Sequence, residues 1–107
     1  MAIRRVINGG ERPRAPSSRA LRPRKPLSWL DPGVFGTLGV GGGFAVGAAA
    51  CKPGREVWLI YGDGSCAYSL NEFDTFCRPG LAPIAIGRND GAWSQIAREQ
   101  IANPKDD

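Results

Sequence analysis

Short apolar segments alternate with turns rich in Gly and Pro along the second half of the chain. Glu56–Tyr61 is an apolar run bounded by turn residues and predicts a buried strand, and Ala82–Ile86 predicts a second short apolar strand. Between them, the pattern over Tyr68–Arg78 predicts an amphipathic helix. Its apolar face is formed by Leu70, Phe73, Phe76 and Cys77. This order predicts a βαβ unit, with two parallel strands joined by a right-handed crossover.

The segments on either side of this unit have their own patterns. Leu21–Pro32 is interrupted by prolines and predicts extended chain, whereas Gly42–Cys51 predicts a helix of small residues that can lie close to a sheet. Ala92–Gln100 predicts the start of another helix. Loops or turns are expected at Gly33–Val40, Lys52–Arg55, Gly62–Ser65, Pro79–Gly80 and Arg88–Gly91. Core positions are expected at Trp58, Phe73 and Phe76.

Basic residues are concentrated at the N-terminus. The chain has 107 residues, enough for one domain, and a formal net charge of +4. Residues 1–26 hold seven Arg and one Lys against one acid, whereas the remainder holds six basic and nine acidic residues. We predict a flexible basic tail over residues 1–20 and a mildly acidic domain over residues 21–107. We expect a cytoplasmic protein, although the Arg-rich N-terminus is also compatible with an organelle transit peptide.

The composition argues against several kinds of site. The sequence contains no His, and its three cysteines, Cys51, Cys66 and Cys77, form no C-x-x-C pair. We therefore expect free thiols and neither a zinc site nor His-based catalysis. The apolar stretch Val40–Cys51 is too short to span a membrane.

Oxygen-bearing side chains stand immediately after each strand of the predicted βαβ unit. The first strand is followed by Asp63 and the second by Asn89 and Asp90. Parallel strands end at a common edge of the sheet, where ligands of open α/β sheets bind, so the topology brings these groups together. With a backbone carbonyl near Gly91, they offer hard oxygens that suit Mg²⁺, which fills its remaining positions with phosphate and water.

The glycines around Asp63 favour a phosphate ligand at the same edge. Gly62 and Gly64 allow close approach of the backbone, and the N–H groups of Gly64 and Ser65 can face a diphosphate. Taken alone, the Gly-Asp-Gly run favours an ordinary structural turn, because Asp-Gly is common turn chemistry. The Asn-Asp pair after the second strand is the observation that favours a ligand site.

Other functions fit the residues less well. A P-loop pattern is absent, and no strict G-x-G-x-x-G follows a strand, which argues against a dinucleotide site. A generic Mg²⁺ or phosphate hydrolase is disfavoured by the lack of further acids and of any His. The Arg cluster leaves a second class open, a non-enzymatic basic-tailed α/β module that binds nucleic acid or an acidic partner. Because groove-reading elements are missing, we expect no nucleic acid partner.

Longer segments resemble a known family. Gly62–Ser65 followed by Asn89–Asp90 resembles the thiamine-diphosphate motif, which begins with Gly-Asp-Gly and closes with an Asn pair. A more specific resemblance, to the acetolactate synthase-like branch that includes 2-hydroxyacyl-CoA lyases, is carried by Trp29–Ala48, Glu72–Phe76 and Asn89–Gln100. It extends from about Leu21 to Gln100 and implies a partial three-layer α/β fold with a parallel sheet, the cofactor-binding C-terminal domain of these enzymes.

The resemblance implies roles for the matching residues. Asp63, either Asn89 or Asp90, and the carbonyl of the Gly91 region would hold Mg²⁺; relatives close the motif with Asn-Asn, and Asp90 replaces the second Asn here. Cofactor contacts are implied for Gly36, Thr37, Leu38, Gly62, Asp63, Gly64, Ser65 and Asn89. Leu38 would bend the cofactor into its V shape, or would belong to the core. Glu72 is interpreted as a surface or packing residue, and no catalytic residue is assigned.

The implied cofactors are thiamine diphosphate and Mg²⁺, with FAD open for the full enzyme. The implied reaction makes or breaks a carbon–carbon bond next to a carbonyl in a 2-oxo or 2-hydroxyacyl substrate. In relatives, a Glu on a separate pyrimidine-binding domain activates the aminopyrimidine, and we expect that missing domain to come from a homo-oligomer. Because the chain ends soon after the motif, we expect a partial domain with little or no activity alone.

Overall fold

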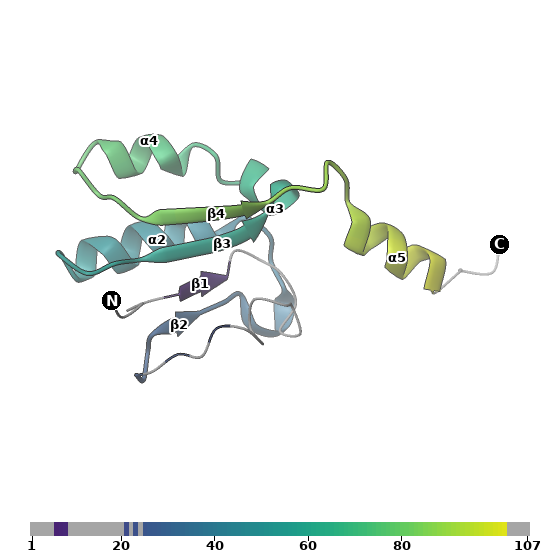
Figure 1. The fold of residues 1–107 in the computed structure, drawn as a ribbon, viewed down its shortest axis with the longest axis horizontal. Coiled ribbons are helices and arrows are strands. Elements are labelled where there is room, and N and C mark those ends of the chain that lie inside the picture. The colour runs from purple at the N-terminus through teal and green to yellow at the C-terminus, as the bar shows by residue number, and fades with distance from the viewer. Residues whose placement is uncertain (1–5, 9–20, 22, 24, 103–107) are drawn as a thin grey trace.

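The described part of the chain is built around one sheet of four parallel strands (Figure 1). The computed structural model describes residues 6–8, 21, 23 and 25–102. Its elements are β1 (Val6–Asn8), β2 (Trp29–Leu30), the 3-10 helix η1 (Gly33–Phe35), α2 (Val40–Cys51), β3 (Trp58–Gly62), α3 (Asp63–Ala67), α4 (Glu72–Cys77), β4 (Ile84–Arg88) and α5 (Ser94–Ala102). The strand order is β2-β1-β3-β4, and every neighbouring pair is parallel. The predicted α/β class with a parallel sheet is confirmed.

β1 differs from the prediction of a flexible tail over residues 1–20. Val6–Asn8 lies between β2 and β3 and pairs with both. For these residues the prediction is wrong, because the Arg-rich composition around them says nothing about the strands that flank them in the fold. The rest of the predicted tail, including its five Arg, lies outside the described residues.

The predicted βαβ unit is present, with boundaries displaced by about two residues. β3 begins at Trp58 rather than Glu56, because Trp58 is the first residue of this strand that pairs on both sides, with Val6 and Ile84. β4 is displaced in the same direction, since its first residue, Ile84, pairs with Trp58.

The junction after β3 is a strand running directly into a helix. Gly62 is still extended (φ −79°, ψ 165°), and α3 begins at the next residue. The sharp turn predicted over Gly62–Ser65 is therefore wrong in detail. The change of direction is made within the first turn of α3, which carries most of the predicted motif.

The single helix predicted over Tyr68–Arg78 is also wrong. α4 is confined to Glu72–Cys77, and the chain before it turns through hydrogen bonds of i→i−3 spacing. Ser69 N–H donates to the Cys66 carbonyl, and Glu72 N–H donates to the Ser69 carbonyl, each at 3.0 Å. These tighter bonds separate α3 from α4.

The apolar face predicted for this helix is only partly in the core. Phe76 is buried, as predicted, but Phe73 is 38% exposed and meets Phe76 only edge-on, with ring centroids 5.7 Å apart, so its prediction as a core residue is wrong. Leu70 is 60% exposed, because it lies in the turns before α4 and not on the helix. Cys77 is exposed as well.

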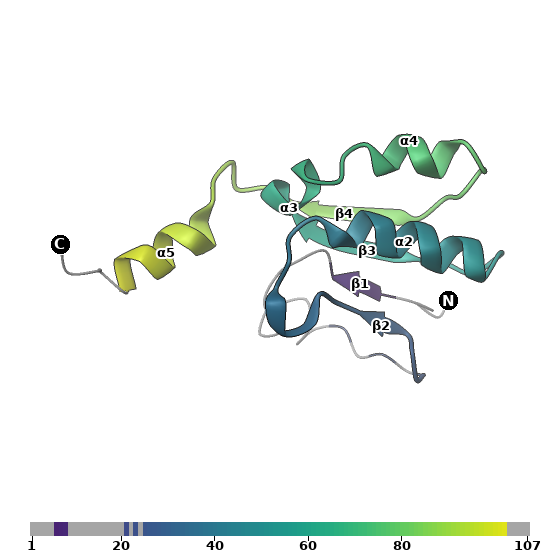
Figure 2. The same cartoon turned by 180° about the vertical axis from the view of Figure 1, so that it is seen from behind.

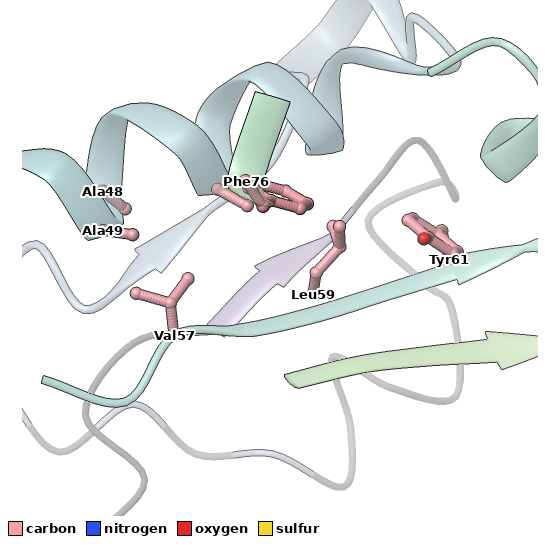
Figure 3. Close-up of a cluster of buried hydrophobic side chains, with 7 residues drawn as sticks. Ala48, Ala49, Val57, Leu59, Tyr61 and Phe76 are labelled. Carbon is pink, nitrogen blue, oxygen red and sulfur yellow. The ribbon is translucent and has the colours of Figure 1, made fainter. Parts of the chain in front are cut away.

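Helices α2 and α4 cover one face of the sheet. α2 lies behind the strands in Figure 1 and in front of them in Figure 2. Val57, Leu59 and Tyr61 point from β3 and the residue before it toward these helices, as Figure 3 shows. The buried apolar cluster comprises Ala45, Ala48, Ala49, Val57, Leu59, Tyr61 and Phe76. Trp58, expected in the core, is half-buried, since strand alternation turns it to the other face.

The small residues of α2 explain how this helix lies close to β3. Ala45, Ala48 and Ala49 are buried, and each presents only a methyl group to the sheet. The helix starts two residues before the predicted range and ends at Cys51, before the turn at Pro53–Gly54. The predicted helix of small residues is confirmed.

α5 projects away from the sheet beyond the end of β4 (Figures 1 and 2). It covers Ser94–Ala102, and none of its residues is buried. Ile96 and Ile101 are 45% and 80% exposed. This helix is thus joined to the body of the domain mainly through the segment between Arg88 and Ser94.

Two further findings concern the cysteines and the length of the helices. Cys51, Cys66 and Cys77 are free thiols, as predicted. None of the described helices is long and apolar enough to cross a membrane.

Candidate functional site

The ends of β3 and β4 bring Asp63 and Asn89 side by side. The last pair in the ladder between these strands joins Gly62 to Arg88. Asp63 is the next residue after β3, and Asn89 is the next residue after β4. The two predicted ligand-bearing segments therefore leave the sheet at the same point, at the edge from which α3 and α5 begin (Figure 1).

Asp63 presents a carboxylate with no partner inside the described part of the chain. It is half-buried and is the first residue of α3, and no hydrogen bond or ion pair to its side chain is formed by the described residues. An acidic side chain in the first turn of a helix is favoured by the helix dipole. The carboxylate is thus held at the edge of the sheet with its oxygens open to a ligand.

The segment after β4 forms two consecutive side-chain-to-backbone turns. Asn89 Oδ1 accepts a hydrogen bond from Gly91 N–H at 2.8 Å, and Asp90 Oδ1 accepts one from Ala92 N–H at 3.2 Å. Gly91 has φ +63°, in the left-handed region that favours glycine. These bonds restrain both predicted metal-binding side chains locally, and one oxygen of Asp90 has no bond to the described residues.

The predicted aminopyrimidine segment is connected to the same edge. Gly39 N–H donates to Ser65 Oγ at 3.2 Å, and Ser65 is buried. This bond ties the residue after Leu38 to the first turn of α3. Leu38 is half-buried, so its two interpretations, cofactor contact and core, both remain predictions.

The other two residues of that segment differ in exposure, since Gly36 is half-buried and Thr37 is exposed. Gly36, with φ +58°, ends η1. The structure brings the end of the segment to the Gly62–Ser65 motif but shows no contact of Gly36 or Thr37 with it among the described residues.

Sequence reasoning missed two aromatic residues at this edge. The six-membered ring of Trp93 packs against Gly64, and the Tyr68 and Trp93 rings meet edge-on with centroids 6.2 Å apart. The sequence places Tyr68 in a predicted helix, and Trp93 at the start of another and within the Asn89–Gln100 resemblance, without a role at the site. The one signal in the sequence is an aromatic residue within a polar segment directly after Asn89–Asp90.

The pKa of a core residue, Tyr61, is raised at this end of β3. Burial, and after it the neighbouring Cys66 thiol, raises the pKa of the Tyr61 phenol above its ordinary value of 10.0. The Tyr61 Oη is buried without a hydrogen-bond partner in the described part of the chain, so the thiol lies near it but outside hydrogen-bond geometry. Tyr61 is therefore a neutral core residue at physiological pH.

The donor set at the edge differs from that of a transition-metal site. Within the described residues, no three His, Cys, Asp or Glu side chains are grouped so that they could hold a metal ion. Asp63, Asn89, Asp90 and the Gly91 carbonyl offer only oxygen ligands from the protein. Such a sparse oxygen set suits Mg²⁺ in company with phosphate groups.

Comparison with known families matches nearly the whole chain. The model of the thiamine pyrophosphate enzyme C-terminal TPP binding domain matches residues 15–106. The chain belongs to this family. The prediction made from the Gly-Asp-Gly motif and its Asn-Asp partner is confirmed at the level of the family.

Curated relatives of this thiamine pyrophosphate enzyme domain include lyases and synthases. The chain is 63% identical to the 2-hydroxyacyl-CoA lyase 2 of Danio rerio over 81 residues, which cover 76% of this chain and 13% of that protein. It is 52% identical to the 2-hydroxyacyl-CoA lyase 2 of Homo sapiens over 96 residues, covering 90% of this chain and 15% of that protein.

A more distant relative is the acetolactate synthase large subunit IlvG of Mycobacterium tuberculosis. It is 43% identical over 68 residues, which cover 64% of this chain and 12% of that protein. The chain thus spans less than a sixth of the length of each of these relatives.

Proposed function

We propose that this chain supplies the Mg²⁺ and diphosphate half of a thiamine diphosphate site. The enzyme would make or break a carbon–carbon bond next to a carbonyl, in the manner of a 2-hydroxyacyl-CoA lyase or an acetolactate synthase. The observation that carries the proposal is the ladder pair Gly62–Arg88, which places Asp63 and Asn89 side by side at the edge of the sheet. Membership of the thiamine pyrophosphate enzyme family supports it.

The donor chemistry fits a magnesium ion bound together with a diphosphate. Asp63 contributes a half-buried carboxylate with no protein partner in the described part of the chain. Magnesium is usually held by one or two carboxylates and by substrate phosphates, with water in the remaining positions. Asp63 would therefore be the principal protein ligand.

Of the two candidates after β4, we propose Asn89 as the second side-chain ligand. Asn89 directly follows the paired residue Arg88, so it stands level with Asp63, whereas Asp90 is one residue further from the sheet. Each side chain accepts one backbone N–H, from Gly91 for Asn89 and from Ala92 for Asp90, so the choice rests on the position of Asn89 level with Asp63. The Gly91 carbonyl would complete the set of protein oxygens.

The first turn of α3 and the end of the Gly36–Leu38 segment would receive the rest of the cofactor. Gly64 and Ser65 in this turn would contact the phosphate oxygens, because the start of a helix favours anionic groups. The bond from Gly39 N–H to Ser65 Oγ holds the proposed aminopyrimidine segment beside them. When bound, thiamine diphosphate supplies an electron sink for carbon–carbon bond cleavage or formation.

The remaining parts of the enzyme would come from outside this chain. We propose that the Glu that activates the aminopyrimidine lies on a pyrimidine-binding domain of another subunit, and that the residues that bind a 2-oxo or 2-hydroxyacyl substrate lie largely outside this chain. On this proposal the isolated chain has little or no activity. FAD in the full enzyme and the cytoplasmic or organellar location stay predictions.

Calorimetric titration of thiamine diphosphate into the chain, with and without Mg²⁺, tests the proposal. Binding should require Mg²⁺ and should be lost in Asp63→Ala and in Asn89→Ala. Asp90→Ala should retain Mg²⁺ dependence. Asp74→Asn is a matched control, because Asp74 pairs with Arg78 on the exposed face of α4, away from the site.

Two outcomes would count against the proposal. A chain that is folded by circular dichroism and binds no thiamine diphosphate in the presence of Mg²⁺ excludes the half-site. Loss of binding in Asp90→Ala but not in Asn89→Ala excludes the ligand assignment and leaves the half-site standing.

A further inference from the structure

The Trp93 ring occupies the space in which a side chain at residue 64 would lie. A Cβ built on Gly64 would be 2.8 Å from both Cη2 and Cζ3 of Trp93 and 3.2 Å from Cε3. Gly64 is not in the left-handed region of backbone conformation. The close approach of the ring, and not backbone strain, therefore explains the need for glycine at this position.

Tyr68 supports the ring from a second direction. The two rings are 6.2 Å apart with an angle of 64° between their planes, an edge-on arrangement that is favourable for aromatic pairs. Tyr68 is itself placed by Gly39, because a Cβ on Gly39 would lie 2.5 Å from Tyr68 Cβ. Trp93 thus rests on two neighbours that belong to the proposed cofactor edge.

The contact between Trp93 and Gly64 joins the segments that follow β4 and β3, beyond the last paired residues of the two strands. Beyond Gly62 and Arg88 the ladder ends, and the hydrogen bonds of Gly91 and Ala92 go to Asn89 and Asp90 within the same turn. The Trp93 carbonyl accepts the N–H of Ala97 at 2.9 Å, in the first turn of the projecting helix α5. The Trp93 side chain therefore ties both the 89–92 turn and α5 back to the first turn of α3.

We propose that Trp93 is a positioning residue of this site. Its ring holds Asn89 at a fixed separation from Asp63, so that the cation and the diphosphate meet preorganised oxygens. This inference rests on the proposed function, because it concerns the affinity of the same site. Residues that orient the ligands of a metal commonly change its affinity by about 10- to 100-fold when they are replaced.

The test measures Mg²⁺-dependent binding of thiamine diphosphate to the chain and three variants. Trp93→Ala should weaken binding by about tenfold or more, whereas Trp93→Phe, which keeps a six-membered ring, should restore most of the affinity. Ile101→Ala is the control for changes on α5, since Ile101 is 80% exposed. Its affinity should equal that of the wild type.

Two further measurements keep the test valid even if Trp93→Ala is unstable: Trp fluorescence and a double-mutant cycle between Gly64 and Trp93. The Trp93 emission, obtained as the difference between wild type and Trp93→Phe, should change when Mg²⁺ and thiamine diphosphate bind. Gly64→Ala should destabilise the wild type but be tolerated together with Trp93→Ala, because the added methyl group then enters space that the ring has left.

The outcomes separate the two proposals. Ligand binding with equal affinity in wild type and Trp93→Ala, or binding without a change in Trp93 emission, overturns the positioning role and leaves the proposed function intact. A folded chain that shows coupling between the stability effects of Gly64→Ala and Trp93→Ala, and yet binds no thiamine diphosphate, rejects the proposed function. That result leaves the contact a role in packing only. Absence of coupling in the cycle rejects the contact itself.

Discussion

Gly42 in α2 lies against Glu72 in α4 so closely that no side chain fits between them. A Cβ on Gly42 would lie 2.8 Å from Glu72 Cγ and 2.9 Å from Ser69 Oγ. The half-buried Glu72 is therefore a packing residue, as the sequence predicted, and the two helices meet across a glycine.

Gly42→Ala is expected to destabilise the domain by about 1–3 kcal/mol, because overpacking forces neighbouring groups to move. The matched control is Gly47→Ala on the same helix, where an added Cβ meets nothing within 4 Å. That change should stabilise by up to about 1 kcal/mol through helix propensity. Urea unfolding followed by circular dichroism measures both, and equal effects in the two variants would contradict the prediction.

Leu59→Ala should be among the most destabilising single changes in the core. Leu59 is fully buried. Its side chain points from β3 toward the helices (Figure 3), and Leu→Ala at such sites costs about 2–5 kcal/mol. Leu70→Ala, at a position 60% exposed, should cost much less. Thermal unfolding of both variants checks the difference, and similar melting temperatures would place Leu59 outside the core.

Tyr61 should make the stability of the domain fall at alkaline pH. Its pKa is higher in the folded domain than in the unfolded chain, so its contribution is fully present below 10.0 and declines as the pH rises above that value. Tyr61→Phe should flatten this decline, and Tyr68→Phe, at a position 69% exposed, should not. Unfolding free energies measured on both sides of the unfolded pKa, at about pH 8 and pH 11, test the difference.

Gly91→Ala should strain the turn that follows β4. The residue has φ +63°, and an L-residue other than glycine pays about 1–2 kcal/mol there, although an added Cβ meets nothing within 4 Å. Gly87→Ala in the exposed strand β4 is the control, because its nearest contact is 3.9 Å away. We expect Mg²⁺-dependent affinity for the cofactor to fall in Gly91→Ala and to stay unchanged in Gly87→Ala. Unchanged affinity in Gly91→Ala would contradict the prediction.

The sequence by itself determined the βαβ unit and the edge at which its polar residues gather. Apolar runs bounded by turn residues predicted the strands, and parallel topology then required Asp63 and Asn89 to leave the sheet together, as the Gly62–Arg88 pair confirms. These are consequences of local pattern and of a general rule of connection, so no knowledge of distant contacts was needed.

Only the tertiary structure decided which distant segments meet. Val6–Asn8 becomes a strand because two other strands flank it. The helix predicted from Tyr68 begins only at Glu72, after turns in which Tyr68 packs against Gly39. The contact between Gly64 and Trp93 has the same character. Each of these features depends on contacts between residues that are far apart in sequence. Hydrophobic periodicity indicates which face of a helix or strand a side chain lies on. It carries no information about which distant residue that side chain will meet.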